Sequence, residues 1–411
     1  MCEINYETPY YVIDKKELEN GLNGLKEALE EYWDNFIIGY SYKTNALPWV
    51  IHFFKQKECY AEVVSDDEYL LAKSIGIDSN KIIYNGIIKS KDTFVEAIQN
   101  GCIVNIDSRR ELDWLDEIPT LYKREIGIRV NFDIEKYCSN HSACGDEGGR
   151  FGFCFENGEL EKAINVIKEK GFSIVGIHLH TSSKTRALDV YQAIAKVACE
   201  IAQCYKLELS YIDIGGGFFG GLSNKPQFKD YLRLVSGILK ECFDPKKTQL
   251  IVEPGMSLIG APVSYVTSVI DVKDTTYNRF IVTDGSRTNI DPLMRKKTYF
   301  HHYDFCSEDQ KKKLKRQVVC GFTCMEHDRL FVAENEVELQ VGDKIVYEKV
   351  GAYTMCLTPL FIKYFPDVYL DDGKDLLKIR NKWTPENYMQ YSIEKEETEN
   401  EYIDFKRRNK K

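Results

Sequence analysis

The stretch FIIGYSYKTN at residues 36–45 is a nearly continuous apolar run that ends in small and polar residues, among them Lys43. Seven further runs of this kind follow, separated by segments of helical length and composition. They are YAEVVS (60–65), KIIYNG (81–86), CIVNID (102–107), IGIRVNF (126–132), IVGIHLH (174–180), LSYIDIGGG (209–217) and QLIVEPG (249–255). Short apolar strands that alternate with helices are typical of a parallel sheet buried on both faces. Eight such units in about 230 residues predict an α/β fold, a TIM-like (β/α)8 barrel.

The sequence changes character after Gly260, where shorter β-rich runs such as PVSYVTSVIDV (262–272) and KIVYEKV (344–350) replace the alternation. Such runs are typical of an antiparallel β domain. A chain of 411 residues, 43% of them apolar, is long enough for a barrel plus a second domain. We therefore expect the barrel at residues 25–258 and a β-rich domain at residues 259–411.

The composition argues against several classes of protein. Thirteen cysteines without an N-terminal apolar signal segment predict reduced thiols and a cytoplasmic location. Because the chain has no run of about eighteen apolar residues, we predict no membrane span. A formal net charge of -9 disfavours nucleic acid as a partner.

The residues that close each apolar run are the candidates for function, because barrel enzymes place their chemistry on the loops after the strands. Lys43 closes the first run, His178 and His180 the sixth, Gly215 to Gly217 the seventh, and Glu253 to Gly255 the eighth. Loops after the last two strands commonly bind phosphate, since glycine lets backbone N–H groups approach the oxygens. A lysine beside a phosphate cradle predicts pyridoxal 5'-phosphate held as a Schiff base on Lys43.

Each of these residues also has a plain structural interpretation: Lys43 as a solvated surface charge, the glycines as a turn, and Glu253 as a cap. Their shared position favours function, because independent structural roles would not place them at the ends of successive strands. Cys138, His141 and Cys144 are spaced like metal ligands, but a structural zinc site requires four ligands and no fourth is evident. We therefore predict no metal.

Nine short motifs follow one another along nearly the whole chain. They are Tyr42-Lys43-Thr44-Asn45, Glu62-Val63-Val64-Ser65 with Glu68, Asn85-Gly86 with Lys89-Ser90, Arg150-Phe151-Gly152, His178-Leu179-His180 with Ser183, Gly215-Gly216-Gly217, Glu253-Pro254-Gly255, Cys324 with Asp328, and Gly351-Ala352-Tyr353-Thr354. In kind and order they resemble the motifs of the fold-type III PLP-dependent decarboxylases, the family of diaminopimelate and ornithine decarboxylases. The resemblance implies an alanine racemase-like architecture, whose β-rich second domain also takes in residues 1–24.

The resemblance also implies a carboxy-lyase of amino-acid metabolism and a role for each motif. Lys43 would hold pyridoxal 5'-phosphate, Glu253 would pair with the pyridine nitrogen, and His180 would cover one face of the ring. Loss of CO2 would give a quinonoid intermediate, which Cys324 of the partner subunit in a homodimer would protonate. The other implied cofactor contacts are Glu62, Ser183, Gly215, Gly216, Gly217, Gly255 and Tyr353.

The chain departs from this family at two positions. Met325 follows the motif cysteine, where diaminopimelate decarboxylases carry a glutamate and ornithine decarboxylases an aspartate that recognises the distal amino group. Met256 stands where an arginine that binds phosphate or substrate usually follows the Glu-Pro-Gly motif. Losing that cation should weaken an anion contact unless Arg287, Arg295 or Lys296 replaces it.

The remaining residues around these motifs indicate the class of substrate. Arg295 and Tyr299 keep the spacing with which diaminopimelate decarboxylases bind a distal carboxylate. We expect these two residues, together with Glu326 and Asp328, to bind the substrate. The prediction is an amino acid whose far end carries a carboxylate or a larger polar group, and diaminopimelate itself is the alternative.

Two further hypotheses remain open. The first is an amino-acid racemase or epimerase on the same fold. In that group an arginine faces the pyridine nitrogen, whereas the acidic Glu253 strengthens the electron sink and favours loss of CO2. The second is a non-catalytic homologue that has lost its cofactor, against which the retention of Lys43, His180, Glu253 and Cys324 weighs.

Overall fold

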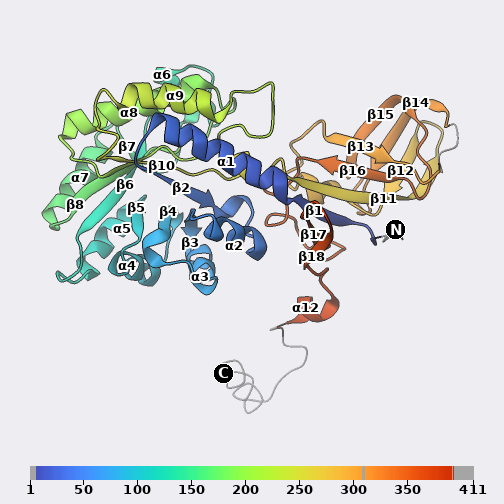
Figure 1. Ribbon diagram of the computed structural model, residues 1–411, viewed down its shortest axis with the longest axis horizontal. Coiled ribbons are helices and arrows are strands. Elements are labelled where there is room, and N and C mark those ends of the chain that lie inside the picture. Colours follow the sequence, from blue (N-terminus) through green and yellow to red (C-terminus); the bar gives the residue numbers. More distant parts are fainter. Residues whose placement is uncertain (1–5, 308–310, 391, 393–411) are drawn as a thin grey trace, which may run out of the picture.

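The computed structural model describes residues 6–307, 311–390 and 392, and Figure 1 shows two domains joined by a long helix. The first domain is a closed barrel of eight parallel strands, because β10 pairs with β2 and β5 pairs with β6. In barrel order the strands are β2 (Phe36–Ser41), β3 (Tyr60–Ser65), β4 (Ile82–Ile88), β5 (Ile103–Ile106), β6 (Glu125–Asn131), β8 (Ser173–His178), β9 (Tyr211–Asp213) and β10 (Gln249–Val252). Each overlaps one apolar run of the sequence, and the predicted (β/α)8 barrel is confirmed.

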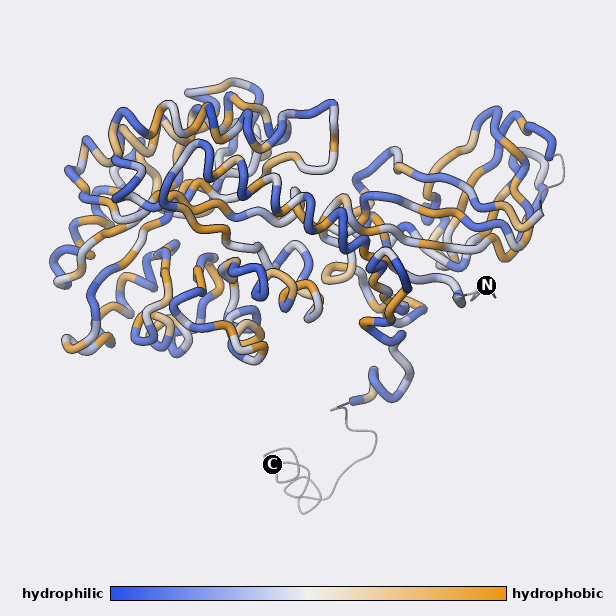
Figure 2. The backbone as a smooth tube through the Cα atoms, viewed as in Figure 1, coloured by the Kyte–Doolittle hydropathy of each residue, from blue (hydrophilic) through white to orange (hydrophobic). Residues whose placement is uncertain are grey.

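Helices connect these strands and cover the outside of the barrel. Figure 2 shows apolar strands through its middle and mixed hydropathy along the surrounding helices, as amphipathic helices require. The α-helices are α2 (Pro48–Gln56), α3 (Asp66–Ser74), α4 (Lys91–Gln99), α5 (Arg109–Trp114), α6 (Ile134–Tyr137), α7 (Glu159–Glu169), α8 (Leu188–Tyr205), α9 (Phe228–Leu239) and α10 (Met256–Ile259). Four single 3-10 turns, η1 (Tyr42–Thr44), η2 (Ser79–Lys81), η3 (Leu115–Glu117) and η4 (Gly145–Glu147), and the two-residue strand β7 (Phe153–Cys154) complete the domain.

Several helices begin almost directly at the end of a strand, and polar caps fix where they start. The Ser65 side chain closes β3 and accepts a hydrogen bond from Glu68 N in the first turn of α3. Ser90 accepts from Thr93 N in the same way before α4. Because a cap satisfies backbone N–H groups that have no partner inside the helix, it holds the loop at the strand end in one conformation.

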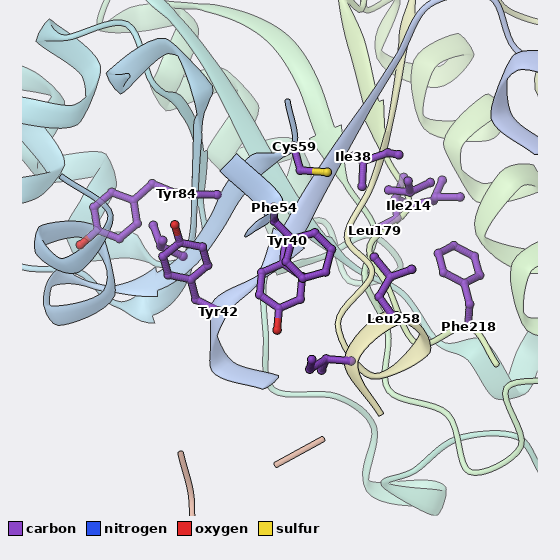
Figure 3. Packing of buried hydrophobic residues seen from close by; sticks show 14 of the residues in the cluster. Ile38, Tyr40, Tyr42, Phe54, Cys59, Tyr84, Leu179, Ile214, Phe218 and Leu258 are labelled. Atoms are coloured by element: carbon purple, nitrogen blue, oxygen red, sulfur yellow. The ribbon is translucent and has the colours of Figure 1, made fainter. Parts of the chain in front are cut away.

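Large aromatic and branched side chains pack between the strands and the helices. Tyr40 of β2 stacks on Phe54 of α2 with ring centroids 3.9 Å apart, and Figure 3 shows this pair beside Tyr42 and Tyr84. These aromatic side chains are almost completely buried. Strand β2, which leads directly to Lys43, is therefore held in place by tightly packed neighbours.

The second domain is a nine-stranded mixed sheet. Its strands are β1 (Tyr10–Asp14), β11 (Val263–Asp274), β12 (Arg279–Thr283), β13 (Phe300–Asp304), β14 (Lys313–Cys320), β15 (Arg329–Val337), β16 (Lys344–Glu348), β17 (Asp367–Asp371) and β18 (Leu376–Arg380), with the short helices α11 (Arg287–Ile290) and α12 (Pro385–Met389). Most pairings are antiparallel, as expected, but β1 pairs with β17 and β12 with β14 in parallel. The sheet is therefore mixed, and not purely antiparallel as its sequence pattern predicted.

Helix α1 (Lys15–Tyr32) links the two domains. It follows β1 of the mixed sheet and packs against α9 and α10 of the barrel, and Figure 1 shows it running from one domain to the other. The domain boundary that we expected near residue 25 falls inside this helix. Within the described residues, no helix has the length and apolar character that a membrane crossing requires, and all twelve cysteines of that part of the chain are free.

Candidate active site

Lys43 lies in η1, directly after β2, and its ammonium group meets a buried carboxylate. Its Nζ donates a hydrogen bond to Glu62 Oε2 at 2.6 Å. Glu62 is 1% exposed and also accepts from Ser41 Oγ at 2.6 Å and from Asn85 Nδ2 at 3.1 Å. Burial would lower the pKa of Lys43, but the carboxylates of Glu62 and Glu253 outweigh it and hold that pKa above its ordinary value.

Glu253, after β10, is the second carboxylate near Lys43 and is also buried. Its Oε1 accepts from Asn85 Nδ2 at 2.5 Å, and its Oε2 lies 3.3 Å from His178 Nε2. Burial would raise the pKa of Glu253, but His178 and Lys43 hold it below its ordinary value. Next to it, burial and the charge of Glu253 keep the pKa of Asp213 well above its usual range. Of these two neighbouring acids, Glu253 therefore favours its charged form and Asp213 its protonated form.

The rings of His178 and His180 are nearly parallel, with centroids 6.3 Å apart. His180 Nδ1 accepts a hydrogen bond from Gly216 N at 3.2 Å, which fixes the ring against the loop after β9. Burial, helped by the charge of Arg129, lowers the pKa of His180 to about 3. At neutral pH the ring is therefore uncharged, which suits stacking on a flat ligand better than proton transfer.

The glycines after β9 and β10 bring backbone close to its neighbours. A Cβ on Gly216 would lie 2.0 Å from the carbonyl oxygen of Glu253, and one on Gly255 would lie 2.1 Å from Thr44 Oγ1. Gly217 adopts a φ of 90°, a conformation that favours glycine. Any larger residue at these positions would displace the strand ends that carry Lys43 and Glu253.

Two adjoining cavities open at this end of the barrel. One, of about 340 Å³, is lined by Glu62, Asn85, Arg129 and Phe151 besides apolar residues. The other, of about 180 Å³, is lined by Ser183, Arg186, Gly216, Gly217, Gly255 and Met256. Both share Lys43, His180, Glu253 and Tyr353. The arrangement fits a flat, charged ring with a phosphate: an amine, a buried carboxylate, a neutral aromatic face, and a glycine-rich end.

These residues match a known family along most of the barrel. A family described as "Pyridoxal-dependent decarboxylase, pyridoxal binding domain" matches residues 17–260, more than half of the chain. The chain belongs to the pyridoxal-dependent decarboxylase family. Its cofactor is pyridoxal 5'-phosphate, and the chain is an amino-acid decarboxylase, a carboxy-lyase.

Named relatives of this decarboxylase agree with that assignment. The chain is 29% identical to diaminopimelate decarboxylase of Aquifex aeolicus over 86% of this chain and 84% of the relative, and 26% identical to that of Methanocaldococcus jannaschii over 92% and 90%. The solved diaminopimelate decarboxylase of M. jannaschii shares the fold with a TM-score of 0.82 at 23% identity, covering 95% and 93%. The arginine decarboxylase of Paramecium bursaria Chlorella virus has a TM-score of 0.74 at 21% identity, covering 89% and 96%.

Three charged residues near the decarboxylase site were given no role from the sequence: Arg129 and Asp213, which lie inside apolar runs, and Asp107, which closes the fourth run. Arg129 of β6 lines the larger cavity, and its Nη1 donates to Asp107 Oδ2 at 2.7 Å. Asp107 also accepts from Gly152 N, which anchors the loop of the Arg-Phe-Gly motif. The third is Asp213 in β9. A charged residue inside an otherwise apolar barrel strand is the signal that could have identified Arg129 and Asp213, and the position of Asp107 at the end of a run is the signal for that residue.

Of the residues predicted to act from the second domain, Tyr353 lines both cavities. The others line neither cavity of their own chain: Arg295, Tyr299, Cys324, Glu326 and Asp328. Cys324 is exposed, and so is Arg295. The Glu326 side chain is 98% exposed and pairs with Arg329 at 3.4 Å, while Tyr299 donates to Asp291.

Asp328 has a different position from the predicted one. It is 2% exposed, and its carboxylate accepts hydrogen bonds from Ser286 Oγ, Arg287 N and Thr323 Oγ1. Because its acceptor sites are occupied within the fold, Asp328 holds the loop of Cys324 and does not face a substrate.

The cysteine and histidine spacing at residues 138–144 does not produce a metal site. Among the described residues, Cys138, His141 and Cys144 form no cluster of ligand atoms, and the ring of His141 instead faces Thr185 Oγ1 at 2.6 Å. The one group of potential ligands in that part of the chain is His178, Asp213 and Glu253, whose atoms lie within 4.8 Å of one another. These three belong to the cofactor site.

Proposed function

We propose that this enzyme removes the α-carboxylate of an amino acid whose far end carries a carboxylate or a larger polar group. The observation that carries the proposal is the chemistry around Arg295. The exposed Arg295 begins a basic segment, Arg295 to Lys297, and no ion pair of the Arg295 side chain occurs among the described residues. A guanidinium without a carboxylate partner is suited to bind an anionic group of a substrate.

Asp291 holds the backbone of this basic segment through hydrogen bonds. Its carboxylate accepts from Arg295 N and Lys296 N and from Tyr299 OH, at 2.9 to 3.1 Å. It also pairs with Arg287 at 3.0 Å. Asp291 thereby fixes the backbone of the basic segment while leaving the Arg295 side chain free of this contact. A substrate that ends in an amine would carry the same positive charge as this segment, and the two would repel each other.

The barrel residues account for the chemistry at Cα. Pyridoxal phosphate, when bound, supplies the electron sink for the electrons of the broken bond. Lys43 presents the amine that would hold the cofactor. Glu253 keeps a negative charge where a protonated ring nitrogen would require one, and His178 Nε2 lies 3.3 Å from its carboxylate. The neutral His180 would exclude water from one ring face.

The proton that replaces CO2 requires a donor, and we assign it to Cys324 of the partner subunit. Cys324 is exposed and lines neither cavity of its own chain, which supports a site shared between two subunits. Mixing inactive Lys43→Ala and Cys324→Ala chains tests this. Half of randomly paired dimers would be mixed and would hold one intact site, so activity should return to about a quarter of wild type. Activity that stays at the level of the two variants would contradict a shared site.

A screen of amino acids for CO2 release tests the substrate proposal. The proposal expects the highest kcat/KM for an amino acid with a distal carboxylate or a conjugated polar group. A preference for ornithine or arginine would overturn it. Inversion of the α-carbon without gas release would instead support a racemase.

Diaminopimelate decarboxylation is the second candidate, because the named relatives carry that activity at 24–29% identity. Diaminopimelate also has a distal carboxylate for Arg295. Its distal amino group, however, would meet Met325 where relatives place a carboxylate. Comparing kcat/KM for diaminopimelate and for analogues without the distal amine separates the two: loss of the amine should cost little under our proposal.

A further inference from the structure

The phosphate end of the site lacks the cation expected at position 256. Met256 lines the smaller cavity beside Gly255, and its side chain is uncharged. The three basic residues considered as replacements, Arg287, Arg295 and Lys296, do not line this cavity. A phosphate dianion bound only by backbone N–H groups and hydroxyls would be poorly neutralised, because nearby cations contribute much of phosphate affinity.

Arg186 lines the same cavity, from the loop between β8 and α8. Its backbone is fixed on both sides: its N–H donates to Ser183 Oγ at 2.9 Å, and its carbonyl accepts from Tyr231 OH at 2.7 Å. Arg186 has a φ of 51°, which is uncommon for a residue other than glycine and persists where the surroundings impose it. The loop therefore holds Arg186 in one position beside Ser183.

In the described part of the chain, the side chain of Arg186 has an aromatic neighbour but no acidic partner. Its guanidinium lies 5.3 Å from the centroid of the Phe219 ring, and within the described residues no carboxylate forms an ion pair with it. Nearby, Tyr191 OH donates to Gly216 O at 2.9 Å and lines the same cavity. Arg186, whose guanidinium has no carboxylate partner among the described residues, thus lines the cavity where the glycine loops and Ser183 meet.

We propose that Arg186 provides the positive charge that binds the cofactor phosphate, in place of an arginine at position 256. One loop would then supply three contacts at a spacing of three residues: His180 to the ring, and Ser183 and Arg186 to the phosphate. A guanidinium matches phosphate well, because its planar N–H groups bind two oxygens at once.

The test compares binding of pyridoxal 5'-phosphate and of pyridoxal, which lacks the phosphate, to the full-length apoenzyme. Dissociation constants come from the visible absorbance of the lysine-bound cofactor. Arg186→Met should weaken binding of pyridoxal phosphate roughly 10- to 100-fold, the effect of one charge-assisted hydrogen bond, and leave pyridoxal binding within about twofold. Inorganic phosphate should compete with the phosphorylated cofactor less well in this variant than in wild type.

Two further variants serve as controls. Lys225→Met removes the other cation over Phe219, at 5.4 Å from its ring, and Lys225 does not line the cavity, so both affinities should be unchanged. The double variant Arg186→Met/Met256→Arg should recover most of the lost affinity. Unchanged binding of pyridoxal phosphate in Arg186→Met, an equal loss for pyridoxal, or no recovery in the double variant would each overturn the proposal.

Discussion

The barrel mouth and the Cys324 loop (residues 321–328) both carry family motifs but differ in how their side chains are used. At the barrel mouth, Glu62 is buried and bound by three donors, and Glu253 is held by Asn85 and His178. In the Cys324 loop, the exposed Cys324 and Glu326 line neither of the two cavities at the barrel mouth. The residues around Lys43 at the barrel mouth thus contact one another within one chain. The Cys324 loop is held in shape by Asp328, but its exposed side chains have no such contacts with the barrel mouth.

The two regions therefore serve different functions, the binding of the cofactor and the choice of substrate. At the barrel mouth, buried groups are joined by hydrogen bonds, so one group cannot move without breaking the bond to its partner. These bonds fix the geometry that the cofactor requires. Exposed loop residues can change without disturbing the fold, so substrate choice can change with them. The departure at Met325 lies in the exposed loop. The departure at Met256 lies in the barrel, and there the charge has a replacement in Arg186.

Replacing Lys43 should have the largest effect. Lys43→Ala should lower kcat on the order of 1000-fold or more, because the residue that holds the cofactor covalently is removed. The visible absorbance of the lysine-bound cofactor should disappear with it. Lys91→Ala, which removes an exposed lysine paired with Glu117, should change neither quantity. A persistent absorbance band in Lys43→Ala would place the cofactor elsewhere.

Neutralising Glu253 should have the next largest effect. Glu253→Gln retains a side chain that can bond Asn85 but loses the buried charge opposite the ring nitrogen. We expect kcat to fall roughly 100- to 1000-fold, with a smaller change in KM, as for loss of one preorganised electrostatic contact. Steady-state kinetics measure both parameters. A kcat within twofold of wild type would show that the charge is not used.

The buried acids of the barrel should also make stability depend on pH. Burial raises the pKa of Glu68 from 4.5 to about 7, so its contribution to stability is complete below about pH 4.5 and is lost as the pH rises through 7. At pH 8, Glu68→Gln should therefore raise the free energy of unfolding by about 3 kcal/mol relative to wild type, and far less at pH 5. Chemical unfolding of the apoenzyme at both pH values measures this.

The Cys324 loop provides the matched comparison for that experiment. The exposed Glu326 is predicted to leave the pH dependence unchanged when replaced by Gln. If Glu68→Gln and Glu326→Gln changed the pH dependence of the free energy of unfolding equally, the buried and the exposed acid would not differ in their effect on stability.

Arg295→Gln should have the smallest effect of the four. With a substrate that has a distal carboxylate, KM should rise roughly 10-fold while the free energy of unfolding stays the same, because an exposed side chain contributes little to the fold. Lys297→Gln, in the same basic segment, serves as the control. An unchanged KM in Arg295→Gln would indicate that the distal group binds elsewhere.

The eight strands were predictable from sequence because buried parallel strands are continuous apolar runs that end in functional residues. The parallel pairings of β1 with β17 and of β12 with β14 were not, since strand direction depends on contacts between distant segments. The predicted mouth residues Lys43, His180 and Glu253 do meet at one pair of cavities.

The contacts of other residues could be found only in three dimensions. The contact of Arg129 at the barrel mouth depends on the side of its strand from which the side chain projects. An apolar run in the sequence does not show this. Asp328 looks like a site residue in sequence, yet its carboxylate is buried and bound by Ser286, Arg287 and Thr323. Arg186 belongs to no family motif, and only the folded chain brings it into the same cavity as Gly216 and Met256.

Mapping the site of cofactor attachment tests the central claim most directly. The holoenzyme is reduced with borohydride, which makes the bond between lysine and cofactor permanent, and the labelled peptide is identified by mass spectrometry. The barrel-mouth arrangement predicts a single pyridoxyl group on Lys43, at one per chain. A label on another lysine, such as the buried Lys89 or the exposed Lys296, would contradict it.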